Sequence, residues 1–231
     1  MKVLITGSNG LLGQKLLHKL RADCSVALIA TSKGDSRWVT GPRARSISHR
    51  LRYEYDAILV GVDTVLKDNP SLDVRWNRRN RITKVVLDST LRTPVNARLF
   101  DSQNLVVIFH GHHAAENRIQ QLSQRAELFC VGEKVGALAW DSILEKLGAA
   151  GIGSLIVEGG ARIAASALSE RIVQKICFLY GPKIIGARGL SGVGDMSIDS
   201  LSKAVQLAGI RLRNLSPDYM IEAYIEPTKT T

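Results

Sequence analysis

The stretch YDAILVGVDTVLKDNPSLDVR, residues 55–75, is the clearest indication of how this chain folds. Within it, DAILVG at 56–61 is a short apolar run without polar–apolar alternation, which predicts a strand buried on both faces. Residues 64–72 follow as a turn-rich loop, because Pro70 ends any local helix. Strands buried on both faces are typical of the parallel sheets of α/β proteins.

The rest of the chain repeats this alternation of apolar runs and amphipathic stretches. Apolar runs predict further strands at 2–6, 25–30, 83–88, 105–109, 127–131, 154–160 and 172–185. Helical spacing predicts helices at 11–20, 42–53, 116–126, 137–151 and 161–170. The tail, 206–226, alternates around Ser-Pro-Asp and predicts a hairpin. The fold class is therefore α/β: a mixed, mostly parallel sheet flanked by helices, with an antiparallel hairpin at the C-terminal end and an atypical strand–helix–strand at the N-terminal end.

Length and composition fit one globular domain over residues 1–231, with residues 1–31 as an atypical opening and 32–226 as the body. The chain has 231 residues, of which 45% are hydrophobic and 23% charged. Its apolar runs are too short to cross a membrane, and its opening is not a convincing signal peptide. Three separated cysteines without a C-x-x-C pair argue against a disulfide framework or a zinc site. We expect a cytoplasmic protein.

The formal net charge of +10 is consistent with an anionic partner. Nucleic acid is one candidate, because RWNRRNR at 75–81 combines arginines with Trp76. A solvated loop between two strands explains this run more simply, so we expect no nucleic-acid partner. A phosphorylated small molecule or NADPH would also use the charge. The run His110-Gly-His112-His113 lacks a supporting carboxylate or cysteine block, so we expect no metal site.

Three glycines near the N-terminus form a separate motif. Gly7, Gly10 and Gly13 lie between a predicted strand and a predicted helix, where their amides could approach a pyrophosphate. Residues 1–37 resemble the N-terminus of the extended short-chain dehydrogenase/epimerase family, and residues 31–33 would favour a 2′-phosphate. That family also needs a Tyr-x-x-x-Lys pair, in which the lysine lowers the pKa of the tyrosine. No tyrosine of this chain has a lysine four residues later.

Six blocks of the body carry a more specific resemblance. In chain order they are GDSRWVTG (34–41), HRLR (49–52), YDAILVGVDTVLKDNPSLDVR (55–75), VVLDSTLRTPVNARLF (85–100), LIVEGGARIAASAL (155–168) and GPKIIG (181–186). Residues 34–226 resemble the pyrimidine reductases of riboflavin biosynthesis, which also form the C-terminal domain of bifunctional deaminase/reductase proteins. The resemblance implies a dihydrofolate-reductase-like fold, NADPH as cofactor and a homodimer. It also implies reduction of the ribosyl group of a 5-amino-6-(5-phosphoribosylamino)uracil-type pyrimidine to ribityl.

The same resemblance implies the site residues. Substrate contacts fall on Ser36, Arg52, Leu72, Arg75 and Glu158. Cofactor contacts fall on Trp38, Thr64, Asp68, Ser89, Gly160, Ala161, Arg162, Ile163, Ala164, Ala165 and Ser166. Arginines suit a sugar phosphate, because the planar fork of guanidinium donors matches phosphate oxygens.

The turn Glu158-Gly159-Gly160 joins a predicted strand to a predicted helix. Its glycines can present amides to a phosphate at the carboxyl end of the strand, although an ordinary strand-to-helix turn would have the same form. Glu158 is the candidate catalytic residue, since a carboxylate beside cationic phosphate sites could orient the sugar hydroxyls or assist protonation.

The N-terminal segment departs from the reductase pattern. The family opens with a central strand of the form T-L-K-x-A-x-S-L-D-G, and this chain has residues 1–31 in its place. We expect residues 26–32 to take that position in the sheet, with residues 2–6 as the alternative. Two other functions stay open: a short-chain-type NAD(P)-dependent dehydrogenase or epimerase, and a catalytically impaired chimeric NADPH-binding protein.

Overall fold

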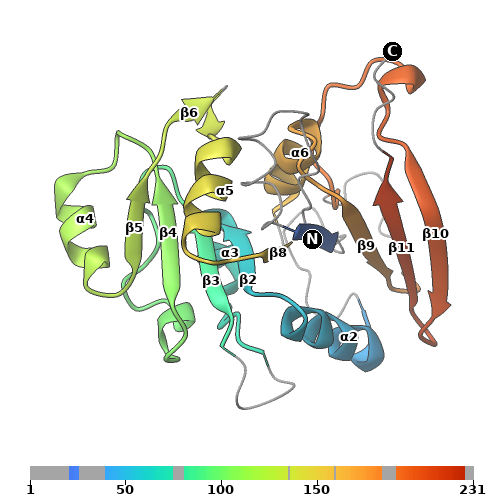
Figure 1. Ribbon diagram of the computed structural model, residues 1–231. Helices are drawn as coiled ribbons and strands as arrows, with labels where there is room; N and C mark the ends of the chain where they lie inside the picture. The colour runs from blue at the N-terminus through green and yellow to red at the C-terminus, as the bar shows by residue number, and fades with distance from the viewer. Residues whose placement is uncertain are drawn as a thin grey trace.

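The structure, a computed structural model, describes residues 40–74, 81–134, 136–158, 160–183 and 191–226, together with the backbone of residues 21–25. In these ranges one large mixed sheet runs through the molecule with helices on both of its faces (Figure 1). Residues 1–20 and 26–39 lie outside the described residues, so the glycine motif at 7–13 and the elements predicted at 2–6 and 11–20 stay predictions.

The order of strands in the main sheet is β10-β11-β9-β1-β8-β2-β3-β4-β5. The bounds in this order are Leu207–Asn214, Tyr219–Ile225, Lys175–Tyr180, Arg21–Ser25, Ser154–Val157, Ala57–Gly61, Thr83–Leu87, Val106–His110 and Glu127–Cys130. All pairings from β9 to β5 are parallel, whereas β11 pairs antiparallel with both β9 and β10. The predicted mixed, mostly parallel sheet with a C-terminal hairpin is confirmed.

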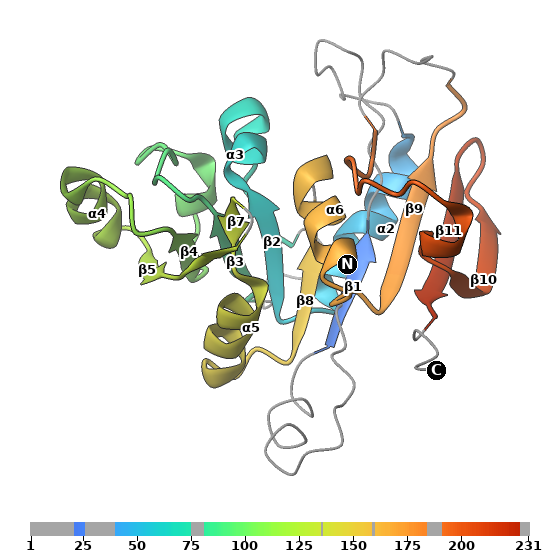
Figure 2. The ribbon, with the colours of Figure 1, turned by 90° about the horizontal axis from the view of Figure 1, so that it is seen from above.

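Five α-helices are described beside this sheet. They are α2 (Pro42–Tyr53), α3 (Val62–Asp68), α4 (Glu116–Ser123), α5 (Trp140–Ala149) and α6 (Ala161–Ser169). Shorter elements are two 3-10 turns, Arg98–Phe100 and Leu201–Lys203, and a small antiparallel pair, β6 (Glu133–Lys134) with β7 (Ala137–Leu138). Seen from above, α5 and α6 lie on one side of the sheet and α2 on the other (Figure 2). The bounds predicted for α2 are confirmed without a shift.

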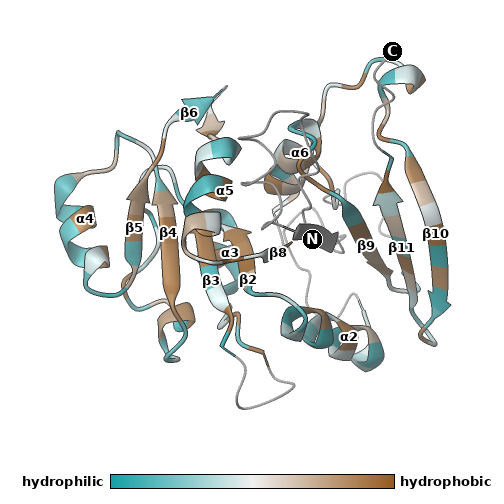
Figure 3. Ribbon diagram, viewed as in Figure 1, coloured by the Kyte–Doolittle hydropathy of each residue, from teal (hydrophilic) through white to brown (hydrophobic). Residues whose placement is uncertain are grey.

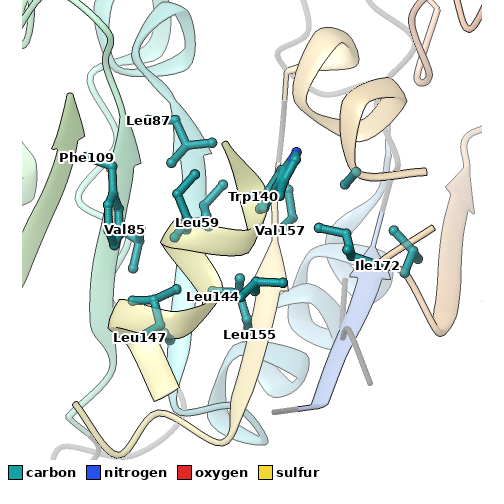
Figure 4. Close-up of a cluster of buried hydrophobic side chains, with 14 of the residues drawn as sticks. Leu59, Val85, Leu87, Phe109, Trp140, Leu144, Leu147, Leu155, Val157 and Ile172 are labelled. Carbon is teal, nitrogen blue, oxygen red and sulfur yellow. The ribbon is translucent and has the colours of Figure 1, made fainter. Parts of the chain in front are cut away.

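The central strands are buried on both faces, as their apolar runs predict. All five residues of β2 and of β4 are buried, and both strands are mainly hydrophobic along their length (Figure 3). Alternate side chains face opposite cores: Leu59 and Val85 pack with Leu144 of α5 (Figure 4), while Ile58 and Val86 pack on the other face with α3 and α4. Each fully buried side chain of this size contributes about 1.5–3 kcal/mol.

Residues 62–68 form the helix α3, and not the turn-rich loop that the sequence predicts. Val62 and Val65 are three positions apart, and both are buried against the sheet. Packing of this apolar pair therefore stabilises a helix that is too short to form alone. Asn69 adopts a left-handed φ of 41° and donates its N–H to the carbonyl of Val65, which ends the helix just before Pro70.

The strand that lies between β8 and β9 is β1 at Arg21–Ser25, and not residues 26–32. Its backbone pairs Arg21 with Ser154 of β8 and Asp23 with Lys175 of β9. Apolar runs indicate strands through side-chain burial, whereas backbone pairing with both neighbours defines this position. The apolar pattern therefore predicts a strand several residues too late, although the central position is filled from the N-terminal segment as expected.

Candidate functional site

Three neighbouring parallel strands end at one edge of the sheet and bring candidate residues together. β8, β2 and β3 lie side by side. Glu158 directly follows β8, α3 with Thr64 and Asp68 follows β2, and Ser89 comes two residues after β3. The amide of Glu158 donates to the carbonyl of Leu59 at 2.8 Å, which extends the pairing of β8 with β2. Ligands of open α/β sheets bind at this carboxyl edge, and Glu158, Thr64 and Ser89 follow the ends of strands that meet there.

A largely buried ion pair joins Arg52 to Glu158. Arg52, in the last turn of α2, donates through Nε to Oε1 at 2.8 Å and through Nη2 to Oε2 at 2.6 Å. The two side chains are only 16% and 15% exposed. Paired donors of this kind fix the plane of the carboxylate as well as its position. Two predicted substrate residues that lie 106 positions apart are therefore in direct contact.

Arg52 keeps Glu158 ionised. Burial alone would raise the pKa of the Glu158 carboxyl, but the charge and hydrogen bonds of Arg52 outweigh burial and hold that pKa below its usual value. Burial alone would lower the pKa of Arg52, and Glu158 reverses that direction. Glu158 is thus a charged hydrogen-bond acceptor, which favours the orientation of hydroxyl groups over the direct donation of a proton.

Glu158→Gln should reduce thermal stability by an amount that depends on pH. A carboxyl whose pKa is depressed by folding stabilises the fold above its unfolded pKa, near 4.5, and loses this contribution as the pH falls through the folded value. The difference in Tm between wild type and Glu158→Gln should therefore be constant at neutral pH and shrink only in acid. Thermal unfolding across a pH series measures it, and a difference that widens in acid would contradict the assignment.

Leu72 lies in a strained backbone segment linked to this pair. Its φ of 57° is left-handed, and its side chain is 3% exposed. Left-handed backbone is costly for a bulky residue and persists only where the surroundings impose it, often at functional sites. The next residue, Asp73, accepts a 3.3 Å bond on its backbone carbonyl from Nη1 of Arg52. Arg52 therefore links Glu158 to the backbone of Asp73, the residue that follows Leu72.

The turn before α6 lies against α3. Gly160 has a φ of 82°, and a Cβ at this position would lie 3.3 Å from Cγ1 of Ile163 and 4.0 Å from Oγ1 of Thr64. The N-cap residue of α6 is Gly160, which has no side chain to accept from the first amides, so these amides carry the partial positive charge of a helix N-terminus. The predicted phosphate turn and Thr64 are thereby brought together.

The other predicted residues of α6 differ in their surroundings. Arg162 is exposed, whereas Ala164 and Ala165 are buried. Ser166 accepts a hydrogen bond from Nε1 of Trp140 at 2.9 Å, which joins α6 to α5. Of these predicted residues only Arg162 is exposed, and the backbone of Gly194 packs against the first turn of α6, where its amide donates to the carbonyl of Ala161 at 2.8 Å.

Two residues that the sequence did not single out complete this edge. Asp63, in the first turn of α3, accepts from Arg162 and, at 2.8 Å, from Nη2 of Arg92. The hydrogen bond from Arg92 is the largest cause that lowers the pKa of Asp63. Both arginines are at least half exposed, so Asp63 holds two cations at the surface beside the α6 turn. Asp63 and Arg92 lie inside the blocks of the resemblance, but nothing in their spacing reveals that they meet.

Ser36, Trp38 and Arg75 lie outside the described residues, as does Gly159, so their roles stay predictions. Within the described ranges, no group of three His, Cys, Asp or Glu side chains is arranged to hold a metal ion. His112 instead contacts the thiol of Cys130, with 3.3 Å between Nδ1 and Sγ. The described helices include none that is long and apolar enough to span a bilayer.

The strand order and the antiparallel C-terminal hairpin define a dihydrofolate-reductase-like α/β fold. The same fold occurs in a solved structure of RibD from Acinetobacter baumannii, with a TM-score of 0.75 and 17% sequence identity. That similarity covers 89% of this chain and 57% of the solved chain.

The chain belongs to the RibD C-terminal domain family, whose model matches residues 27–221. It is 33% identical over 186 residues to the riboflavin biosynthesis protein RibD of Actinobacillus pleuropneumoniae, covering 78% of this chain and 48% of that protein. It is also 33% identical over 198 residues to the 2,5-diamino-6-ribosylamino-4(3H)-pyrimidinone 5′-phosphate reductase of Methanothermobacter thermautotrophicus. That match covers 84% of this chain and 90% of the relative. The chain spans about half the length of the RibD relatives it matches. The family match includes residues 27–37, which overlap the dehydrogenase-like segment.

Proposed function

We propose that this chain is an NADPH-dependent reductase of riboflavin biosynthesis. It would convert the ribosyl group of a 5-amino-6-(5-phosphoribosylamino)uracil-type pyrimidine to ribityl. The observation that carries the proposal is the Arg52–Glu158 pair, held at the carboxyl edge two residues before the Gly160 turn. The relative from Methanothermobacter thermautotrophicus, of which 90% is covered, is named as a reductase of a ribosylaminopyrimidinone 5′-phosphate, which supports the same chemistry.

The residues around the α6 turn fit the phosphates of a dinucleotide. The N-terminal amides of α6, which follow a glycine at the N-cap, suit close approach of an anion, with the hydroxyl of Thr64 beside Gly160. When bound, NADPH would supply the hydride that reduces C1′ of the ring-opened sugar. The protein contributes orientation and charge complementarity.

Glu158 would orient the substrate, and Arg52 would both hold Glu158 and face the phosphorylated sugar. The ionised carboxylate of Glu158 can accept hydrogen bonds from sugar hydroxyls. Among the described residues, Arg52 uses three N–H groups on Glu158 and Asp73. A guanidinium has five such donors, so two are left for an anionic substrate.

Arg162 and Arg92 would recognise the negative charge of the cofactor at the exposed side of the α6 turn. Arg162→Gln or Arg92→Gln should weaken NADPH binding about tenfold and leave the weaker binding of NADH nearly unchanged, because a charge-assisted bond to the 2′-phosphate is lost. Titration calorimetry with both nucleotides measures the ratio, with Arg98→Gln as an exposed control nearby in the chain. An equal loss for NADPH and NADH would contradict this role.

The proposed function is tested by the oxidation of NADPH in the presence of the phosphoribosylaminopyrimidine, in both its deaminated and its aminated form. Turnover with one of the two forms supports the proposal and identifies the substrate. Absence of turnover with both at saturating concentrations would reject it.

We expect this reductase to act on a small phosphorylated molecule in the cytoplasm, without a nucleic-acid or membrane partner, and to form a homodimer. The edge strand β10 supports the dimer, because its side chains are almost all exposed and include Ile210 and Leu212, at 63% and 65%. An exposed apolar edge strand is a site where a second chain can pair. Sedimentation at equilibrium distinguishes dimer from monomer.

A further inference from the structure

One strand of the sheet carries a buried lysine that is surrounded by apolar side chains. Lys84, the second residue of β3, is 0% exposed. It pairs with Ile58 of β2 and Val106 of β4, both of which belong to the apolar core on the face of α3. Because side chains alternate along a strand, Lys84 projects to the same face as Val86.

The Lys84 ammonium has a full set of specific partners. Nζ donates to the carbonyl of Leu99 and to Oγ of Ser102, both at 2.8 Å, and it lies 2.8 Å from Oδ1 of Asp73. An ammonium has three donors, and three acceptors meet it here. A buried ammonium is strongly disfavoured unless its partners compensate for lost hydration, so this geometry is closely specified.

Asp73 connects Lys84 to the candidate site. Its carboxylate also accepts from Nδ2 of Asn104 at 3.2 Å. Burial alone would raise the pKa of Asp73, and the hydrogen bond from Lys84 is the foremost of the contacts that lower it instead. The backbone carbonyl of the same residue accepts from Nη1 of Arg52, and Leu72 precedes it in the chain. A continuous chain of bonds thus runs from Lys84 through Asp73 and Arg52 to Glu158.

We propose that Lys84 is a positioning residue for the substrate half of the site: by fixing Asp73, it holds both the carbonyl that anchors Arg52 and the segment that carries Leu72. The proposal rests on the proposed function and deepens it. Among the described residues, Thr64, Gly160 and Arg162 of the cofactor half form no hydrogen bond with this chain of residues, and Arg162 pairs instead with Asp63. Loss of Lys84 should therefore weaken substrate binding and leave nucleotide binding unchanged.

A purely structural role for Lys84 makes a different prediction. Replacement of a buried ion pair by apolar residues is often neutral or stabilising, so stability alone says little about such a pair. If Lys84 only supports the fold, Lys84→Met would change Tm and leave the kinetics of the folded enzyme unaltered. If Lys84 positions Arg52, the KM of the substrate changes whichever way Tm moves.

The experiment compares Lys84→Met, Asp73→Asn and the double variant in the full chain, with Val86→Ala as control. Val86 is fully buried on the same strand and face, and truncating it should lower Tm without touching Asp73. We expect Lys84→Met to raise the KM for the phosphoribosylaminopyrimidine about tenfold or more, as for the loss of a charged hydrogen bond. The dissociation constant of NADPH should stay within about twofold of the wild-type value. The double variant should raise the substrate KM no further than the single variant with the larger effect, because the two residues act through one contact.

The outcomes separate the two proposals. Turnover by the wild type with an unchanged substrate KM in Lys84→Met would overturn the positioning role while leaving the proposed function intact. Absence of turnover by the wild type would instead reject the proposed function. If Lys84→Met does not fold, Asp73→Asn decides: a raised substrate KM with normal NADPH binding supports the role, and wild-type values overturn it.

Discussion

Arg52→Met is expected to lower kcat/KM for the phosphoribosylaminopyrimidine by on the order of a thousandfold. The variant removes both bonds that orient Glu158 and leaves a carboxylate that is 15% exposed without its cation. It also removes the donors that are left for the phosphorylated sugar. Because an unpaired buried charge is costly, we expect a loss in the free energy of unfolding of about 3 kcal/mol.

Arg50→Met is the matched control for Arg52→Met. Arg50 lies on the same helix and forms an ion pair with Glu54, but both side chains of that pair are substantially exposed, at 64% and 42%. Exposed pairs contribute little, so activity and stability should stay close to wild type. Similar kinetics for the two variants would show that Arg52 has no special role at the site.

A double variant separates stability from activity at this pair. Arg52→Met with Glu158→Met replaces both charges by apolar side chains, which should recover much of the lost stability. Activity should not recover, because neither the acceptor nor the donors remain. Recovery of both would mean that the pair is structural only.

Gly160→Val is expected to weaken NADPH binding by at least about thirtyfold. Its φ of 82° is strained for a β-branched residue, and the new Cβ would lie 3.3 Å from Cγ1 of Ile163. The turn would have to move, and the amides of α6 would no longer face the phosphate. Titration calorimetry with NADPH measures the loss, and circular dichroism checks the fold.

Gly10→Val tests the competing use of the N-terminal glycines. If NADPH binds at the α6 turn, this variant should bind NADPH within about twofold of wild type, because the phosphates of the cofactor would then contact the amides of α6 and not those of residues 7–13. A dehydrogenase-type site at residues 7–13 predicts the opposite pattern, with binding abolished by Gly10→Val and preserved in Gly160→Val. The two variants together identify which glycine motif holds the cofactor.

The sequence predicts most of the fold because the apolar runs report burial directly. The strands around Leu59 and Val85 are covered on both faces, so each run is mostly apolar, apart from Thr83 and Lys84 of β3, and its boundaries differ from the structure by one residue. The sequence does not predict helix α3, because Val62 and Val65 become helical only when they pack on the sheet. The predicted position of β1 is wrong because the strand is defined by its backbone pairing with β8 and β9, which an apolar pattern does not indicate.

The sequence predicts several residues of the site, but it does not predict which of them contact one another. The resemblance selects Arg52 and Glu158, but it does not say that they form a pair across 106 positions. Lys84 and Asp63 were not selected, because an isolated lysine in a strand and an aspartate at a helix start have many ordinary explanations. Their roles follow only from the loops and helices that the fold brings to them.

The most direct measurement uses NADPH that carries deuterium at both positions of C4 of the nicotinamide, with mass spectrometry of the pyrimidine product. We expect stoichiometric oxidation of the cofactor and a ribityl product with deuterium at the former C1′. We also expect Arg52→Met to slow this transfer by on the order of a thousandfold and Arg50→Met to leave it close to the wild-type rate. Oxidation of NADPH without deuterium in the pyrimidine product, or no reaction with either pyrimidine, would contradict hydride transfer from NADPH to the sugar by this protein.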